Sequence, residues 1–215
     1  MTTGDATAPA TTRLVPPRLP ATHVERPELA GPLRRAVHDP DRAVVLVSAP
    51  AGAGKTTLLA SLAHHDDLTV AWLQLDRADD EPVRFWTAVT AAIGRVRPEV
   101  AARVEPVVRT TRGHRDSVVS TLIDAVAEVE PFVLVLDDHH LVEDDEVHQG
   151  VDQLIEHQPA TLTLAISTRV DPPLRLGRLR VRGRLHEVRN ADLRMGPDAA
   201  RPCSAPTMPS SARPR

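Results

Sequence analysis

Short runs of apolar, often β-branched residues alternate along the chain with stretches of helical periodicity. The runs have the length of strands that are buried on both faces, and the strongest of them ends in two carboxylates, Asp137 and Asp138. They occupy residues 42–50, 69–76, 131–140 and 160–168, with a weaker candidate at 184–189. The pattern therefore predicts four buried strands and a fifth, less apolar one.

Between these runs, apolar residues recur every three or four positions, which predicts helices. We expect them at 24–37, at 53–64, from Pro82 onward, from about residue 117 to 126, and at 147–157. Strands that alternate with helices predict an α/β fold with a parallel sheet covered on both faces. Ligands of such folds bind at the carboxyl ends of the strands.

The helix boundaries and the chain ends carry further signals. Asp79 and Asp80 are candidate caps for the helix at Pro82, and Asp116 or Ser117 for the next helix. The Pro- and Arg-containing segment between these two helices predicts a connection. Residues 1–20 predict a disordered arm, 21–200 one domain, and 201–215 a disordered tail that resembles a frameshifted or truncated end.

Composition narrows the class of protein. The 215 residues carry a net charge of -3, which gives no general attraction to nucleic acid. No run of about 20 apolar residues exists to span a membrane. One cysteine excludes an internal disulfide, and the polar start lacks the layout of a secretion signal. We therefore expect a cytoplasmic protein without direct DNA binding or membrane contact.

The segment SAPAGAGKTT, residues 48–57, follows the first predicted strand and precedes a helix. It matches the phosphate-binding pattern G-x-x-x-x-G-K-[ST] except for Ala49 in place of the first glycine. Gly52 and Gly54 allow backbone N–H groups to turn toward an anion at a helix N-terminus. The alternative is a glycine turn without a ligand. The loop residues expected to hold nucleotide are Gly52, Ala53, Gly54, Lys55, Thr56 and Thr57.

Lysine usage supports the phosphate interpretation. The chain has 26 basic residues, and Lys55 is its only lysine. A compact ammonium reaches phosphate inside a tight loop, whereas the planar guanidinium of arginine does not fit there. The hydroxyl of Thr56 is the expected ligand of Mg²⁺.

Two further groups fall at the carboxyl ends of predicted strands. Asp137 is the candidate metal ligand and Asp138 the candidate base for the attacking water, although two acids after a strand can also be a simple turn. Arg169 is placed to contact a γ-phosphate, and the alternative is a solvated arginine at a turn. The pairs His64-His65 and His139-His140 lack the partners of a zinc site, so we expect exposed or packed histidines.

The sequence resembles the nucleotide-binding domain of the large ATP-dependent regulators of the LuxR family, the MalT-like branch of the STAND NTPases. The resemblance rests on the loop, on "RFW" at 84–86, on Asp137, Asp138 and His140, and on "ADLR" at 191–194. It implies a P-loop NTPase three-layer αβα sandwich with a mainly parallel sheet (ASCE/STAND type), with ATP or ADP and Mg²⁺ as ligands. It also implies that Val24 and Arg26 lie near the adenine, that Arg169 is the γ-phosphate sensor, and that the domain can self-associate.

After "ADLR" the sequence departs from the family, which continues into a lid, a sensor domain and a DNA-binding helix-turn-helix. The hypothesis is therefore an ATP-binding, weakly hydrolysing switch module of such a regulator. Two alternatives stay open: a stand-alone P-loop enzyme such as a small-molecule kinase, and a non-functional gene fragment. A kinase would need a phosphoacceptor pocket and an arginine-bearing lid, and neither is assignable in the sequence.

Overall fold

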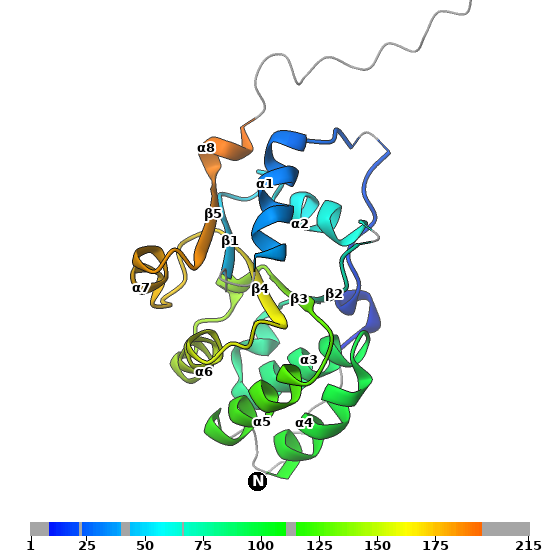
Figure 1. Cartoon of the computed structure of the whole chain (residues 1–215), viewed down its shortest axis with the longest axis vertical. Coiled ribbons are helices and arrows are strands. Elements are labelled where there is room, and N and C mark those ends of the chain that lie inside the picture. Colours follow the sequence, from blue (N-terminus) through cyan, green and yellow to red (C-terminus); the bar gives the residue numbers. More distant parts are fainter. Residues whose placement is uncertain (1–8, 22, 40–43, 66, 111–114, 195–215) are drawn as a thin grey trace, which may run out of the picture.

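The structure, a computed structural model, describes residues 9–21, 23–39, 44–65, 67–110 and 115–194. Five parallel strands form one sheet, in the order β2-β3-β4-β1-β5 (Figure 1). The strands are β1 (Val44–Ser48), β2 (Val70–Gln74), β3 (Phe132–Asp137), β4 (Leu162–Thr168) and β5 (Leu185–Arg189). All five predicted strands are confirmed. Since β4 lies between β1 and β3, its carboxyl end stands between the glycine loop and the two aspartates.

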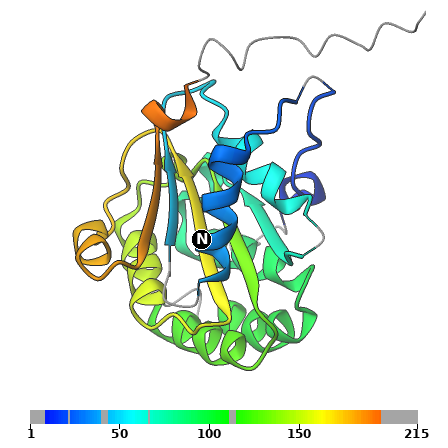
Figure 2. The same ribbon diagram turned by 45° about the horizontal axis from the view of Figure 1, so that its top comes forward.

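Alternate residues of each strand enter opposite apolar layers, as the two-residue period of a strand requires. In β1, Val44 and Leu46 face one layer, while Val45 and Val47 face the other. The smaller layer contains α1 (Pro27–His38) and α2 (Lys55–Ala63). Figure 2 shows α1 lying along the sheet. The predicted three-layer αβα sandwich of the P-loop NTPase type is confirmed.

The larger layer covers the other face of the sheet. It is built by α3 (Pro82–Gly94), α4 (Pro98–Thr110), α5 (Arg115–Ala127) and α6 (Asp145–Glu156), and α7 (Leu176–Val181) joins it at the β5 side. The short helix α8 (Asn190–Leu193) follows β5. The predicted helices are present within a few residues of their expected bounds.

The connection expected between α3 and α5 is wrong, because α4 occupies it. Pro98 is the first residue of α4, where a missing N–H costs nothing. Val100, Val104 and Val108 recur at intervals of four and are all buried. Pro98 and Pro106, the second of which lies inside the helix, favour a break in the sequence pattern, so the apolar stripe of valines does not predict a helix there.

Two predicted caps are also wrong. Glu81 caps α3, since its carboxylate accepts hydrogen bonds from the N–H groups of Val83 and Arg84. Asp79 and Asp80 belong to the short 3-10 helix η2 (Arg77–Asp80) that precedes α3. Asp116 and Ser117 lie inside the first turn of α5 and not before it.

The expectation of a disordered arm is wrong for residues 9–20, which include the 3-10 helix η1 (Thr11–Leu14). Leu14 is buried in the larger core, and Arg13 forms ion pairs with Asp76 and Asp79 beside the end of β2. Residues 1–8 and the tail at 201–215 lie outside the described part of the chain.

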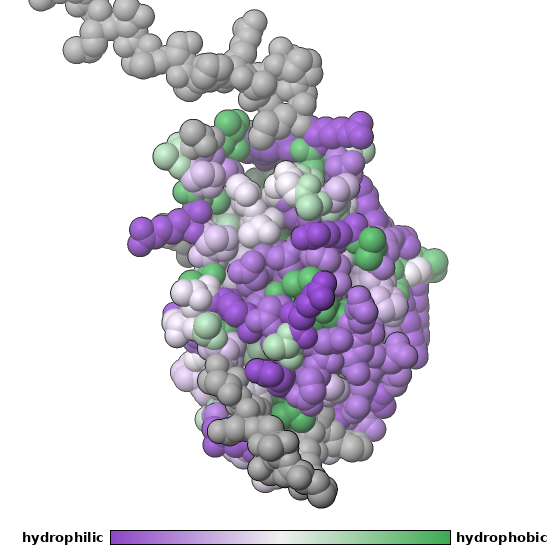
Figure 3. Space-filling view, turned by 180° about the vertical axis from the view of Figure 1, so that it is seen from behind, coloured by the Kyte–Doolittle hydropathy of each residue, from purple (hydrophilic) through white to green (hydrophobic). Residues whose placement is uncertain are grey.

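The face shown in Figure 3 is mostly hydrophilic, with small separate apolar patches. Within the described residues, none of the helices combines the length and the apolar character that a membrane span requires. Many arginines of the α7–β5 region are paired with acids: Arg178 with Glu156, and Arg180 with Glu187. Neighbouring acids therefore neutralise part of the positive charge of the arginines in α7 and β5.

Candidate nucleotide site

The glycine loop joins β1 to α2 at the carboxyl edge of the sheet. Gly52 and Gly54 have positive φ angles of 76° and 90°, which residues with a Cβ rarely adopt, and α2 begins at the next residue, Lys55. Ala49 has no positive φ and continues the strand pairing, with its N–H donating to the carbonyl of Thr168 at 3.2 Å. The alanine at the loop entry is therefore compatible with the loop geometry.

Lys55 is folded into the loop rather than extended into solvent. Its side chain is largely buried, and Nζ donates to the carbonyl oxygen of Pro50 at 3.0 Å. Burial lowers the pKa of Lys55, while the negative charges of Asp138 and Asp137 act in the opposite direction. The ammonium group thus lies against the loop backbone.

Thr56 and Asp137 face each other across this edge of the sheet. The Thr56 hydroxyl donates to the Asp137 carboxylate, with Oγ1 at 3.1 and 3.0 Å from the two carboxylate oxygens. Asp137 is completely buried, and burial raises its pKa. The structure thus brings together the two residues that the sequence analysis assigned to Mg²⁺.

Ser167, at the end of β4, links the two aspartates and was not identified from the sequence. Its hydroxyl donates to the Asp137 carboxylate and accepts a hydrogen bond of 3.0 Å from the backbone N–H of Asp138. In the sequence, Ser167 is only a hydroxyl residue near the end of a predicted strand, and its contact with Asp137 depends on β4 pairing with β3.

Asp138 has a left-handed backbone conformation, with φ 60° and ψ 36°, and is the only non-glycine residue with a positive φ in the described part of the chain. Such a conformation is costly for most residues and is least so for Asp and Asn. It directs the chain from β3 into the 3-10 helix η3 (His139–Leu141). The side chain of Asp138 remains about a quarter exposed, at 26%.

Arg169 directly follows β4 and is exposed. Its positive charge lowers the pKa of both Lys55 and His140, after the larger effect of burial on each. The charge of Arg169 therefore acts on the part of the site near the glycine loop. Because Arg169 is exposed, water weakens this effect.

A cavity of about 180 Å³ adjoins the glycine loop on the side of α1. Val24, Leu29, Leu58 and Leu193 give it apolar walls, and Gly54 and Thr57 connect it to the loop. Arg26 also lines the cavity, but its guanidinium donates to the carbonyls of Asp192, Leu193 and Arg194 at 2.9, 2.7 and 3.3 Å. The segment around Arg26 is thereby fixed to the end of α8.

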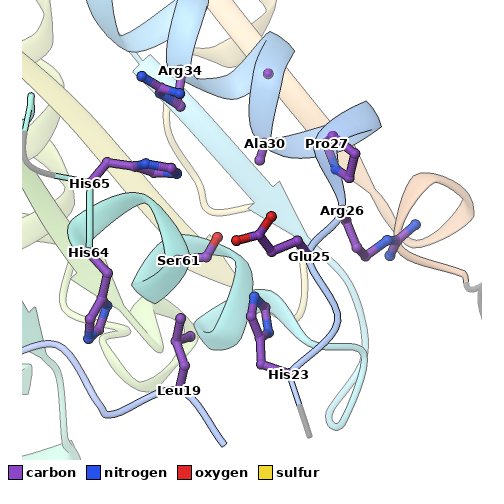
Figure 4. A pocket seen from close by; sticks show the side chains of 11 residues that line it. Leu19, His23, Glu25, Arg26, Pro27, Ala30, Arg34, Ser61, His64 and His65 are labelled. Atoms are coloured by element: carbon purple, nitrogen blue, oxygen red, sulfur yellow. The ribbon is translucent and has the colours of Figure 1, made fainter. Parts of the chain in front are cut away.

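A second, more polar cavity of about 300 Å³ continues along α2 and shares His23, Arg26, Ala30 and Ser61 with the first. Figure 4 shows Glu25 pointing between α1 and α2 toward Ser61, with His64 and His65 at and just beyond the end of α2. Within the described residues, no group of three His, Cys, Asp or Glu side chains is arranged to hold a metal ion. The first cavity adjoins the glycine loop, and the second adjoins the first along α2.

Comparison with known proteins gives both a fold and a sequence relationship. A Signal Transduction ATPase with Numerous Domains (STAND) protein with a tetratricopeptide repeat sensor from Pyrococcus horikoshii aligns with a TM-score of 0.51 at 14% identity, covering 80% of this chain and 24% of that one. No protein-family model matches the chain. The fold is that of a P-loop NTPase of the STAND class.

In sequence, the chain is 35% identical over 150 residues to the HTH-type transcriptional regulator MalT of Yersinia enterocolitica, and 35% identical over 151 residues to that of Serratia proteamaculans. Each match covers 67% of this chain but only 16% of the relative. The chain is therefore similar in sequence to a segment of the MalT regulators and has the fold of a STAND P-loop NTPase domain, and it spans a small part of the length of these regulators.

Proposed function

We propose that this domain is the ATP-binding switch module of a MalT-like transcriptional regulator, and that it hydrolyses ATP only slowly. The observation that carries the proposal is the contact between Thr56 and the buried Asp137 beside a loop with two left-handed glycines. P-loop NTPases offer magnesium a hydroxyl from the first turn of the helix that follows the loop and a carboxylate from the end of a nearby strand. Thr56 and Asp137 are such a pair, and they are in contact.

The phosphates would lie over the loop. Gly52 and Gly54 orient backbone N–H groups, and the N-terminus of α2 adds the favourable end of its dipole. Lys55 would exchange its bond to the Pro50 carbonyl for a bond to a phosphate oxygen. Because that carbonyl is neutral and phosphate is an anion, the exchange favours binding.

The metal would lie between Thr56 and Asp137, with Ser167 holding the carboxylate in position. Mg²⁺ prefers oxygen ligands and keeps several waters, which agrees with a donor set of one hydroxyl and one carboxylate. Bound Mg²⁺ neutralises charge on the terminal phosphates. Its positive charge would also offset the cost of keeping Asp137 ionised in a buried position.

The nucleoside would occupy the apolar cavity next to the loop. Val24 and Leu193 offer apolar surface to a base, while Arg26 acts by fixing the cavity wall to α8. This assignment modifies the sequence expectation for Arg26, because its guanidinium is already engaged by backbone carbonyls.

Slow hydrolysis would follow from the surroundings of Asp138 and Arg169. Phosphoryl transfer requires a positioned water and charge stabilisation in a site that excludes bulk solvent. Asp138 is partly exposed and Arg169 is exposed, so solvent weakens both contributions.

Calorimetric titration of the chain with Mg-ATP and Mg-ADP tests the proposal. We expect binding of both nucleotides, loss of at least tenfold in affinity for Lys55→Ala, and phosphate release close to background. Arg109→Ala, which removes an exposed cation in α4, is the matched control and should bind normally. Folded wild-type protein that binds neither nucleotide would refute the proposal.

A further inference from the structure

The two histidines of η3 lie in different surroundings. The His139 ring is completely buried and lies 5.4 Å, centroid to centroid, from the ring of His148 on α6. Burial lowers the pKa of His139 to about 3, so this ring is neutral at ordinary pH. His140, the next residue of η3, lies near Asp138: its ring atom Nδ1 is 3.9 Å from the Asp138 carboxylate.

His140 is nine-tenths buried, with 10% of its side chain exposed. Neither of its ring nitrogens has a hydrogen-bond partner among the described residues. A buried polar group without a partner destabilises the folded state, so such groups in folded proteins usually have a partner or a function. The ring therefore has hydrogen-bonding capacity that the described residues leave unused.

The charges around His140 indicate what kind of ligand it could contact. After burial, the charges that most affect its pKa are those of Arg169, Asp138, Lys55 and Asp137, in that order. These are the residues of the proposed phosphate and magnesium site. With Nδ1 at 3.9 Å from Asp138, whose backbone N–H donates to the same Ser167 hydroxyl that bonds Asp137, His140 lies on the side of the proposed magnesium site. The lining of the apolar cavity next to the loop does not include it.

An anion fits this position better than a second metal. The described residues provide no set of three metal-binding side chains. Of the charges that act on His140, the positive charge of Arg169 has the largest effect, and Lys55 adds a second cation against the carboxylates of Asp138 and Asp137. These two cations favour a phosphate oxygen. A neutral imidazole carries one N–H that can donate to such an oxygen.

We propose that His140 donates a hydrogen bond to the terminal phosphate of a bound nucleoside triphosphate and so makes the site prefer triphosphate over diphosphate. This inference rests on the proposed function. The geometry of Asp138 explains how the ring is placed: its left-handed backbone begins η3 directly at the end of β3, and His140 lies next to the Asp138 carboxylate.

The test is the ratio of ATP to ADP affinity, measured by calorimetry in the presence of Mg²⁺. We expect His140→Ala to weaken ATP binding about tenfold and to leave ADP binding unchanged, because a hydrogen bond to a charged group contributes on this scale. His140→Gln retains an N–H donor of similar reach and should recover part of the preference.

His157→Ala is the control, since it removes an exposed histidine at the end of α6. Circular dichroism and thermal unfolding of each variant establish that it is folded. An unchanged ATP to ADP ratio in folded His140→Ala, with both nucleotides bound, would overturn this inference and leave the proposed function intact. Failure of the wild type to bind either nucleotide would overturn both.

Discussion

At the scale of single residues, the glycine loop needs glycine at positions 52 and 54 but not at position 49. Gly54 has a φ of 90°, and a Cβ built there would meet no atom within 4 Å. The requirement is therefore conformational and not steric. Ala49, by contrast, extends β1 with an ordinary strand hydrogen bond. Only the later glycines of the loop pattern carry a backbone constraint in this protein.

We predict that Gly54→Ala destabilises the protein by about 1–2 kcal/mol, which is the cost of a left-handed conformation for a residue with a Cβ. Chemical denaturation measures the change. Gly177→Ala is the matched control, because that glycine lies in α7, has no positive φ, and also has open space around its Cβ position. The control should be neutral or slightly stabilising. Equal losses in the two variants would contradict the prediction.

At the scale of elements, η1 is attached to the carboxyl end of β2 by one arginine. Arg13 donates to the carbonyl of Gln74 at 2.8 Å and pairs with Asp76 at 2.9 Å. It also pairs with Asp79, whose side chain is only 4% exposed. From this attachment the chain runs to the apolar cavity next to the glycine loop, whose lining includes Pro20. Arg13 and Arg26 therefore fix the two ends of the segment that lines this cavity.

We predict that Arg13→Ala lowers the free energy of unfolding by about 2 kcal/mol, because it leaves the buried Asp79 carboxylate without its ionic partner. Adding Asp79→Asn should recover part of the loss, since it removes the unpaired charge. Urea denaturation of the two single variants and the double variant gives the coupling between the residues. Additive effects would show that the ion pair does not stabilise the protein.

A second ionic cluster fixes β5 to its neighbours. Hydrogen bonds from Arg180 and Arg189 lower the pKa of Glu187 to about 2, and Arg189 also lowers the pKa of Asp171. An acid with a lower pKa in the folded state stabilises the protein above its unfolded pKa. This stabilisation decreases as the pH falls from the ordinary range of a glutamate toward about 2.

We predict that part of the acid sensitivity of unfolding comes from Glu187. In urea denaturation between pH 7 and pH 3, Glu187→Gln should flatten the fall in stability relative to the wild type. Glu128→Gln provides the control, because Glu128 is 68% exposed and forms only a surface pair with Arg103. A pH profile of Glu187→Gln that parallels the wild type would exclude this source.

Most elements could be predicted from the sequence because their apolar periods are strong. Four strands follow from short apolar runs, and α6 from its spacing, whereas β5 gave only a weaker, less apolar signal. The missed element, α4, shows the limit: its valines were visible, but prolines at Pro98 and Pro106 were interpreted as breaks. Caps were harder still, since Asp79, Asp80 and Glu81 are adjacent acids and only the path of the backbone selects Glu81.

At the scale of the whole molecule, the candidate site is assembled from segments that a parallel sheet brings to one edge. The pairing of Thr56 with Asp137 follows from two motifs at strand ends, so the sequence analysis could anticipate it. Ser167 and His140 could not be found in the same way. Their roles depend on β4 lying between β1 and β3, and on the direction that Asp138 gives to η3.

Each of the two apolar layers of the molecule contains its own fluorescent side chain. The chain has two tryptophans and no tyrosine. Trp72 lies in the layer with α1 and α2, and Trp86 in the layer with α3 to α6, each about 1% exposed. The intrinsic fluorescence therefore comes from one indole on each side of the sheet. In Trp72→Phe and Trp86→Phe, the remaining emission follows one layer alone, so coincident denaturation curves would mean that both layers melt together.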